Sequence, residues 1–276
     1  MKTDIVELRN YYEKPIGSLT RDLVNARLCE LWGEARGQSV LGFGYADPYL
    51  NPFLNHADRV ISVMPAAQGV AVWPDRDSVR VCLADEAGWP LPDASVDRII
   101  VAHGLEEAES PRRLLREIWR VLVDDGRVVV VAPNRRGLWA QFDHTPFGHG
   151  RPYSRNQLTR LLEECLFAPT AWSQSLHMPP IGLRFMLRSA PAWERAGERL
   201  WPAFAGVVMV EAAKELYGAR LAPRRAPLLK AVAETAAPTP ETRTAAREDL
   251  ALRLVKAQAV SKTKNLNSQN QGGNVP

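Results

Sequence analysis

The sequence has few cysteines and no long apolar run, which argues against a disulfide-rich protein and against a membrane-spanning one. Its three cysteines, Cys29, Cys82 and Cys165, lie far apart among apolar neighbours. We therefore expect a reduced, cytoplasmic setting and no disulfide framework. No stretch of about 18 apolar residues occurs, so no membrane-spanning helix is expected. The charged start, MKTDIVELRNYYEKP, also lacks the apolar centre of a signal peptide.

Several motifs that carry catalytic chemistry are missing as well. The sequence contains no Gly-x-Ser-x-Gly elbow, no P-loop and no His-Glu-x-x-His helix. His144 and His149 have no recognised metal-ligand spacing, and no cysteine stands near them, so no metal is expected.

The positive charge belongs to the tail. The net charge is +4, but residues from Gly218 onward hold 10 Lys/Arg and 4 Asp/Glu, a balance of +6, which leaves about 4 − 6 = −2 for the body. The body therefore gives no electrostatic case for nucleic acid. The basic tail is compatible with a protein partner or with weak binding to an anionic partner.

Short apolar runs alternate with amphipathic stretches over most of the chain. Two helices are expected over 4–35, the second from about Thr20 to Ala35. Ser110 and Ser154 are expected to cap two further helices, the first of which stops at Asp124-Asp125-Gly126. Strands are expected near 39–43, 59–64, 78–83, 96–102, 127–132, 170–177 and 206–213, and a helix within 182–204. This alternation predicts a doubly wound α/β sheet.

Three regions follow from this pattern. N-terminal helices cover 1–35, an α/β domain covers 36–217, and a basic, Ala/Pro-rich tail covers 218–276. The tail is expected to be disordered apart from a possible helix at 241–258.

The stretch SVLGFGYADPYL, 39–50, has the form of a cofactor loop. A strand, a glycine turn and a helix start bring backbone N–H groups against a ligand. Farther on come LADEAGWPLPDASVDRIIVAHGL, LLREIWRVL with GRVVVV, and GHGRPYSRNQLTRLLEECLF.

Together these motifs resemble the class I S-adenosylmethionine (SAM)-dependent methyltransferases, in particular the small type 11 branch. The resemblance covers roughly 36–170, and more loosely to 217. It implies a Rossmann-like sheet of seven strands with the last one antiparallel, and SAM as the cofactor. Its implied cofactor-binding residues are Gly42, Gly44, Tyr45, Ala46, Met64, Asp85, Glu86, Trp89 and His103.

The cofactor motif departs from the family pattern. Gly42 stands where the family has an acidic residue, and Ala46 and Pro48 stand for two of its glycines. Met64 replaces the acid that bonds the ribose hydroxyls. Each such charge-assisted bond contributes on the order of 1.5–3 kcal/mol, so SAM loses its usual main anchor.

The segment 135–154 follows the fifth expected strand, at the edge where α/β sheets bind ligands. Its polar and aromatic residues indicate either an acceptor pocket or a self-bonded loop with Asp143 paired to Arg151. The candidate substrate-binding residues are Trp139, Asp143, His144, His149, Arg151 and Tyr153. His103 and His144 are candidate general bases, or structural histidines. Glu106 and Glu107 are expected to be a solvated helix entry.

Two functions remain open at this point. The first is a SAM-dependent methyltransferase acting on an unidentified, small-molecule acceptor. The second is a methyltransferase fold with a degenerate cofactor motif that serves as a non-catalytic binding or regulatory module.

Overall fold

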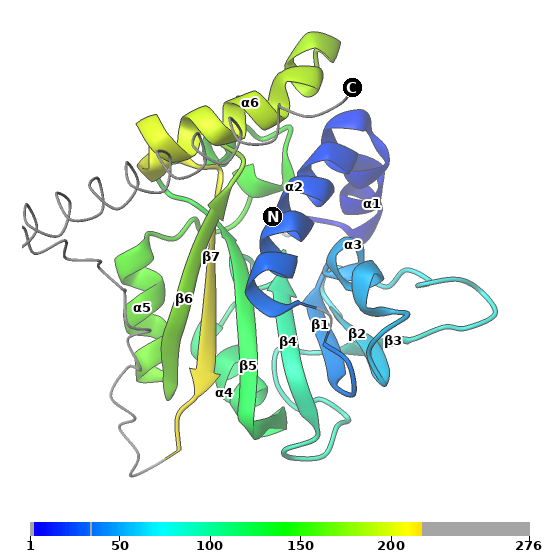
Figure 1. Cartoon of the computed structure of the whole chain (residues 1–276). Coiled ribbons are helices and arrows are strands. Elements are labelled where there is room, and N and C mark those ends of the chain that lie inside the picture. The colour runs from blue at the N-terminus through cyan, green and yellow to red at the C-terminus, as the bar shows by residue number, and fades with distance from the viewer. Residues whose placement is uncertain (1–2, 34, 217–276) are drawn as a thin grey trace, which may run out of the picture. The chain divides into compact units, whose positions relative to one another are not determined.

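One mixed β-sheet organises the part of the chain that the structure describes. The structure is a computed structural model, and it describes residues 3–33 and 35–216, so the expected helix at 241–258 lies outside the described residues. The strand order is β3-β2-β1-β4-β5-β7-β6 (Figure 1). The strands are β1 (Ser39–Gly44), β2 (Arg59–Pro65), β3 (Val81–Ala84), β4 (Val96–Ala102), β5 (Leu122–Pro133), β6 (Phe167–Ser175) and β7 (Val207–Lys214).

The strand directions confirm the predicted doubly wound sheet. Neighbouring pairs among β1 to β5 are parallel, whereas β7 runs antiparallel to both β5 and β6. The reversed last strand is the one that the resemblance implies. All strands except β7 therefore end at one edge of the sheet, here called the carboxyl edge, where ligands bind in open α/β sheets.

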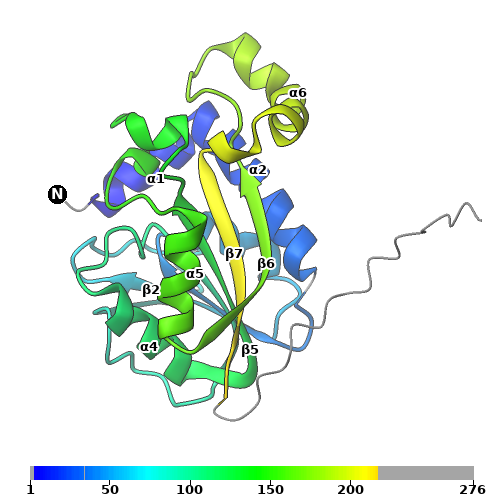
Figure 2. The ribbon, with the colours of Figure 1, turned by 90° about the vertical axis from the view of Figure 1, so that its left-hand side faces the viewer.

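Helices cover both faces of the sheet (Figures 1 and 2). One apolar core cluster joins the sheet to α1, α2, α3 and α6, and the other joins it to α4 and α5. The helices are α1 (Ile5–Glu13), α2 (Pro15–Trp32), α3 (Asp47–Leu50), α4 (Pro111–Val121), α5 (Arg155–Glu164) and α6 (Arg184–Leu200), with 3-10 turns η1 (Asn51–Phe53), η2 (Leu138–Gln141), η3 (Pro146–Gly148) and η4 (Pro202–Phe204).

Local sequence explains the best-predicted elements. The valine run 128–131 of β5 is buried, as expected for a strand covered on both faces. The apolar stripe of α4, Leu114 to Val121, faces the core. Ser154 caps α5 with a capping box, because its hydroxyl accepts from the Gln157 N–H while the Gln157 side chain accepts from Ser154.

Several expected boundaries were wrong. The second helix begins at Pro15 rather than near Thr20, and it ends at Trp32. Strand β3 begins at Val81 instead of residue 78. Helix α4 ends at Val121, before Asp124, because Leu122 already pairs with Val96 in the sheet.

The predicted cap of α4 was also wrong. The Ser110 side chain makes no capping bond. Instead the Glu86 carboxylate accepts from the backbone N–H groups of Glu109 and Ser110, at 2.5 and 2.9 Å. A carboxylate at this position also suits the positive end of the helix dipole.

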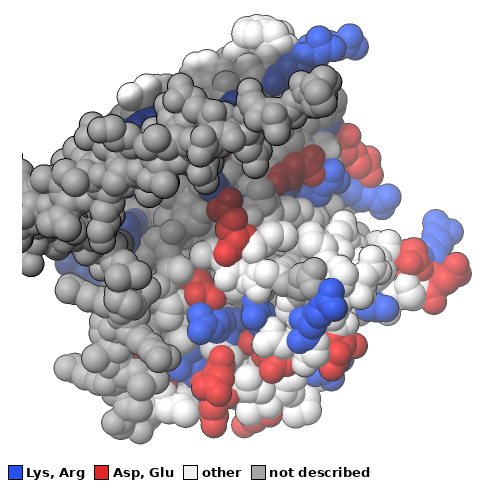
Figure 3. Space-filling view, in the orientation of Figure 1, with Lys and Arg blue, Asp and Glu red and all other residues white. Residues whose placement is uncertain are grey.

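The surface carries both signs of charge. On the face shown in Figure 3, acidic and basic side chains are interspersed rather than gathered by sign. None of the described helices is long and apolar enough to cross a membrane.

Candidate functional site

The glycine turn forms at the carboxyl edge, as predicted. Gly44 ends β1 with φ +84°, and a Cβ there would lie 2.2 Å from the Ala102 carbonyl oxygen of β4. Only glycine fits both this conformation and this close approach. The helix that follows the turn, α3, has only four residues.

A buried polar cluster lies beside this turn. His103 follows β4, and its Nε2 is 2.7 Å from the hydroxyl of Tyr12 on α1. That hydroxyl also bonds the Tyr49 hydroxyl of α3 at 2.6 Å. On the other side of the ring, His103 Nδ1 lies 3.5 Å from Glu106 Oε1. Tyrosine, imidazole and carboxylate thus form a row at the carboxyl edge.

Glu106 is the residue that sequence reasoning missed. The expectation of a solvated helix entry is wrong, because Glu106 is only 2% exposed. Neither carboxylate oxygen has a hydrogen-bond partner among the described residues. A buried carboxylate that makes no hydrogen bond costs several kcal/mol, at least about the 1–3 kcal/mol of one unmade bond. Glu107 follows Glu106 directly, and nothing in the sequence shows which of the two carboxylates is buried.

The backbone at His103 is strained. Its φ of +51° is uncommon for a residue with a side chain, and such outliers gather at functional sites. The His103 carbonyl accepts from the Gln68 amide at 2.5 Å, so this conformation is held from the β2 side. Gln68 is itself 3% exposed.

Burial also shifts the acidities around the turn. Removal from water raises the pKa of Tyr12 well above its ordinary value, with further contributions from the neighbouring tyrosines. Burial likewise raises the pKa of Asp47, the first residue of α3, to about 6, while the hydrogen bond from Ser62 acts in the opposite direction. Both groups are therefore held in their neutral forms more strongly than in water.

The other predicted cofactor residues lie in different surroundings. Tyr45 and Ala46 are buried in the turn, and Met64 is fully buried with its sulfur 3.3 Å from the Ala71 N–H. Asp85 is exposed directly after β3. Trp89 stacks on Phe43, 5.1 Å between ring centres, in the core cluster on the α4 side. Glu86 caps α4, as described above.

The loop 135–154 is held by bonds within itself and by bonds to residues 178–180. The Trp139 indole is buried and donates to the Met178 carbonyl at 2.7 Å. His149 Nε2 lies 2.9 Å from the Asp143 carbonyl oxygen, and His144 Nε2 lies 3.0 Å from that of Pro180.

Three contacts join this loop to the polar cluster and the backbone beside it. The Arg151 N–H donates to the Glu106 carbonyl at 2.8 Å, and the Tyr153 hydroxyl donates to the Leu105 carbonyl at 3.3 Å. Phe147 lies against the His103 ring, with 4.9 Å between centres. The loop therefore forms one wall of the cluster.

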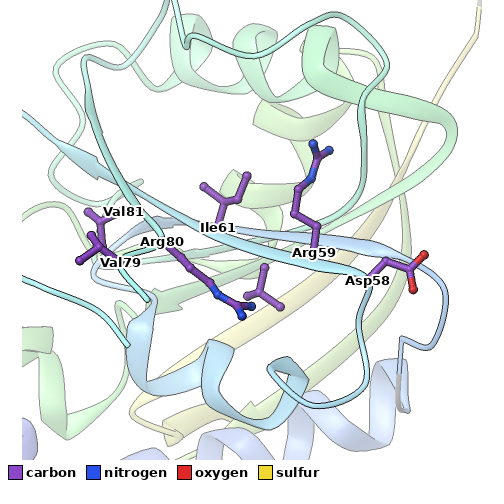
Figure 4. Close-up of a pocket in the computed structure, with 7 residues that line it drawn as sticks. Asp58, Arg59, Ile61, Val79, Arg80 and Val81 are labelled. Atoms are coloured by element: carbon purple, nitrogen blue, oxygen red, sulfur yellow. The ribbon is translucent and has the colours of Figure 1, made fainter. Parts of the chain in front are cut away.

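Two surface pockets lie away from this cluster. One, of about 440 Å³, is at the amino-terminal ends of β2 and β3, opposite the carboxyl edge (Figure 4). Its Arg59 and Arg80 side chains point in opposite directions there, so they do not converge on a ligand. The other, of about 460 Å³, lies along the edge strand β6. Within residues 3–33 and 35–216, no three His, Cys, Asp or Glu side chains gather as a metal site would require.

Comparison with known proteins points to one family. Residues 41–130 match the family described as Methyltransferase domain (Methyltransf_11). Rv3030, a probable S-adenosylmethionine-dependent methyltransferase of Mycobacterium tuberculosis H37Rv, is 36% identical over 103 residues, 37% of each chain. The uncharacterized protein YafS of Escherichia coli K12 is 31% identical over 116 residues, 42% of this chain and 44% of YafS. The chain spans less than half the length of these curated relatives.

Solved structures share the fold. A SAM-dependent methyltransferase from Thermotoga maritima, described as a possible histamine N-methyltransferase, superimposes with a TM-score of 0.55 at 16% identity, covering 76% of this chain and 96% of that one. A SAM-dependent methyltransferase from Archaeoglobus fulgidus does so with a TM-score of 0.50 at 18% identity, covering 70% and 94%. Residues 41–130 therefore match a methyltransferase domain, within a chain that has the class I methyltransferase fold.

Proposed function

We propose that the chain is a SAM-dependent methyltransferase that acts on a small-molecule acceptor. The observation that carries this proposal is the buried His103–Glu106 pair beside the glycine turn. It lies at the carboxyl edge of a sheet whose first strands match the methyltransferase domain. The names of the mycobacterial relatives support the same activity.

One buried residue suits the charge of the cofactor. SAM carries a cationic sulfonium and an ammonium group, and Glu106 offers a buried carboxylate without a hydrogen-bond partner among the described residues. A cation there would gain a charge-assisted partner. Asp85, at the end of β3, is proposed to accept from the adenine. In this proposal Glu106 supplies the anchoring charge that Gly42 and Met64 do not.

The pair also suits proton transfer. The bound cofactor would supply a methyl group on a positively charged sulfur. His103 Nε2 is placed to take a proton from an acceptor hydroxyl or amine as that acceptor is methylated. Glu106, 3.5 Å from Nδ1, would stabilise the imidazolium that forms. His144 is the second candidate base, and the loop 135–154 is proposed to bind the acceptor through Trp139, Asp143, His144, His149, Arg151 and Tyr153.

The second candidate, a non-catalytic module with a degenerate cofactor motif, has an observation in its favour. Every residue from Val40 to Leu50, which includes the whole turn, is buried in the structure. A turn covered in this way needs a means of access before it can serve a cofactor.

Calorimetric titration with SAM and with its demethylated product separates the two functions. We expect dissociation constants in the micromolar range. Glu106→Gln should weaken SAM binding tenfold or more and raise the stability of the unliganded protein, because the amide needs less solvation. Glu109→Gln, in the same segment but exposed, is the matched control and should bind as the natural chain does. No heat at millimolar SAM would favour the module.

The base is tested separately. His103→Ala should lower kcat on the order of 10²–10⁴-fold, since a general base acts on the acceptor, and it should not weaken SAM binding. We also propose a cytoplasmic location, which the free state of Cys29, Cys82 and Cys165 supports. The tail 218–276 stays a predicted place for a protein partner.

A further inference from the structure

Helix α1 covers the glycine turn. Figure 1 shows α1 beyond the carboxyl ends of the strands, next to α3. The Tyr12 ring of α1 lies 5.6 Å from the Tyr45 ring and 6.0 Å from the Tyr49 ring, centre to centre. Tyr12 is 6% exposed, and Tyr45, within the turn, is equally buried. A side chain of the chain's own N-terminal helix thus fills the space against the turn.

The Tyr12 hydroxyl also blocks the proposed catalytic base, His103. His103 Nε2, the atom proposed to take the acceptor's proton, is bonded to Tyr12 at 2.7 Å. The same hydroxyl bonds Tyr49 at 2.6 Å. While these bonds persist, the base has no free position for an acceptor.

The start of α1 is attached by hydrogen bonds to the segments after β2 and β4, beside the apolar packing of Ile5 and Leu8 in the core cluster. The Thr3 N–H donates to the Glu107 carboxylate at 3.1 Å, and the Ile5 N–H donates to the Gln68 carbonyl at 3.0 Å. At its other end α1 meets α2 at Lys14, which has extended backbone angles of −74° and 155°. A single extended residue between two helices can absorb the rotation of one of them, as hinges do.

We propose that α1 is a lid over the cofactor site, closed in this structure, with Tyr12 as its latch, and that SAM enters only when α1 swings away. This proposal rests on the proposed function. Opening would uncover the turn and free His103 Nε2 in one movement. The apparent affinity for SAM is then the intrinsic affinity reduced by the fraction of molecules with an open lid.

Weakening the latch should therefore tighten SAM binding. Tyr12→Phe keeps the ring but removes both hydroxyl bonds, so the open fraction grows, and calorimetry should show SAM bound several-fold more tightly. Arg9→Gln is the control, since the exposed Arg9 side chain bonds Glu13 within α1 and this bond moves with the helix. It should leave the affinity unchanged. Equal or weaker binding by Tyr12→Phe would overturn the lid.

Locking the lid should abolish binding. A Cβ built on Gly69 lies 4.0 Å from the Ile5 Cβ, within the range that a disulfide spans. The double variant Ile5→Cys, Gly69→Cys ties α1 to the segment after β2. Gly69 has φ +97°, so the variant is strained, but its oxidised and reduced forms share that strain and are compared with each other. The natural chain, given the same oxidant, controls for its own cysteines.

We expect the oxidised form to bind no SAM and the reduced form to bind it, with hydrogen exchange of the α1 amides slowed only by oxidation. Equal SAM binding in both forms would overturn the lid and leave the proposed function standing. Binding by neither form, nor by the natural chain, nor by Tyr12→Phe, would overturn both.

Discussion

The acidity of Asp47 gives a prediction about stability that needs no ligand. Asp47 begins α3, directly beyond the glycine turn, and is 6% exposed. Its carboxylate accepts one bond, from the Ser62 hydroxyl at 2.6 Å. Burial raises its pKa from 3.8 to about 6 against the effect of that bond. The folded protein therefore holds this proton more tightly than the unfolded chain.

The raised pKa of Asp47 makes the protein less stable as the pH rises. Stability from this group is complete below about pH 4, and it is lost as the pH rises through 6, because the folded state then carries a buried charge. A shift of about two pKa units, at about 1.4 kcal/mol each, corresponds to about 3 kcal/mol. Asp47→Asn keeps the shape and cannot ionise, so it should lack this loss.

Urea unfolding, followed by tryptophan fluorescence between pH 4 and 7.5, measures the difference. The advantage of Asp47→Asn over the natural chain should grow by about 3 kcal/mol from pH 4 to pH 7 and then level off. Other groups titrate in both proteins and cancel. Ser62→Ala, which removes the donor, should extend the loss to higher pH. A difference that stays constant from pH 4 to 7.5 would refute the assignment.

Three further substitutions test the core packing and the helix cap of α5. Gly197→Ala should destabilise the protein by roughly 1–3 kcal/mol in thermal unfolding, because its Cβ would lie 2.2 Å from the His177 Cβ. Ser154→Ala should cost about 1 kcal/mol of unfolding free energy, because it removes the capping box of α5. Gly42→Asp should cost more than about 3 kcal/mol, because its carboxylate enters a packed core, and circular dichroism should show partial or complete unfolding. Unchanged midpoints would contradict each expectation.

The sheet was predictable because its signals are local. The valine run of β5 and the apolar stripe of α4 can be read within about a dozen residues, and the capping box of Ser154 spans four. The glycine turn follows from Gly44 in the same way. What failed at the boundaries depended on distant partners, such as the pairing of Leu122 with Val96 that ends α4 early.

The site was less predictable because it is assembled from distant segments. Glu106 is buried because the loop at Gly150 packs on its backbone, where a Cβ would lie 2.6 Å from the Glu106 carbonyl oxygen. Tyr12 reaches His103 across 91 residues of sequence. No periodicity in either segment encodes these contacts, so the sequence pattern marked His103 but not its neighbours.

The replacements in the cofactor motif depend on one another. A Cβ at Gly42 would lie 2.7 Å from both the Ala46 Cβ and a Leu50 methyl, so the acid of the family pattern has no room there. Ala46 and Leu50, fully buried, fill that volume with apolar atoms. Met64, facing the same cluster, replaces the second acid with an apolar side chain. A carboxylate returned to residue 42 would be buried against these apolar side chains. The charge that such a site needs therefore has to come from another strand end, and Glu106, which follows β4, is the buried carboxylate beside the turn that has no hydrogen-bond partner among the described residues.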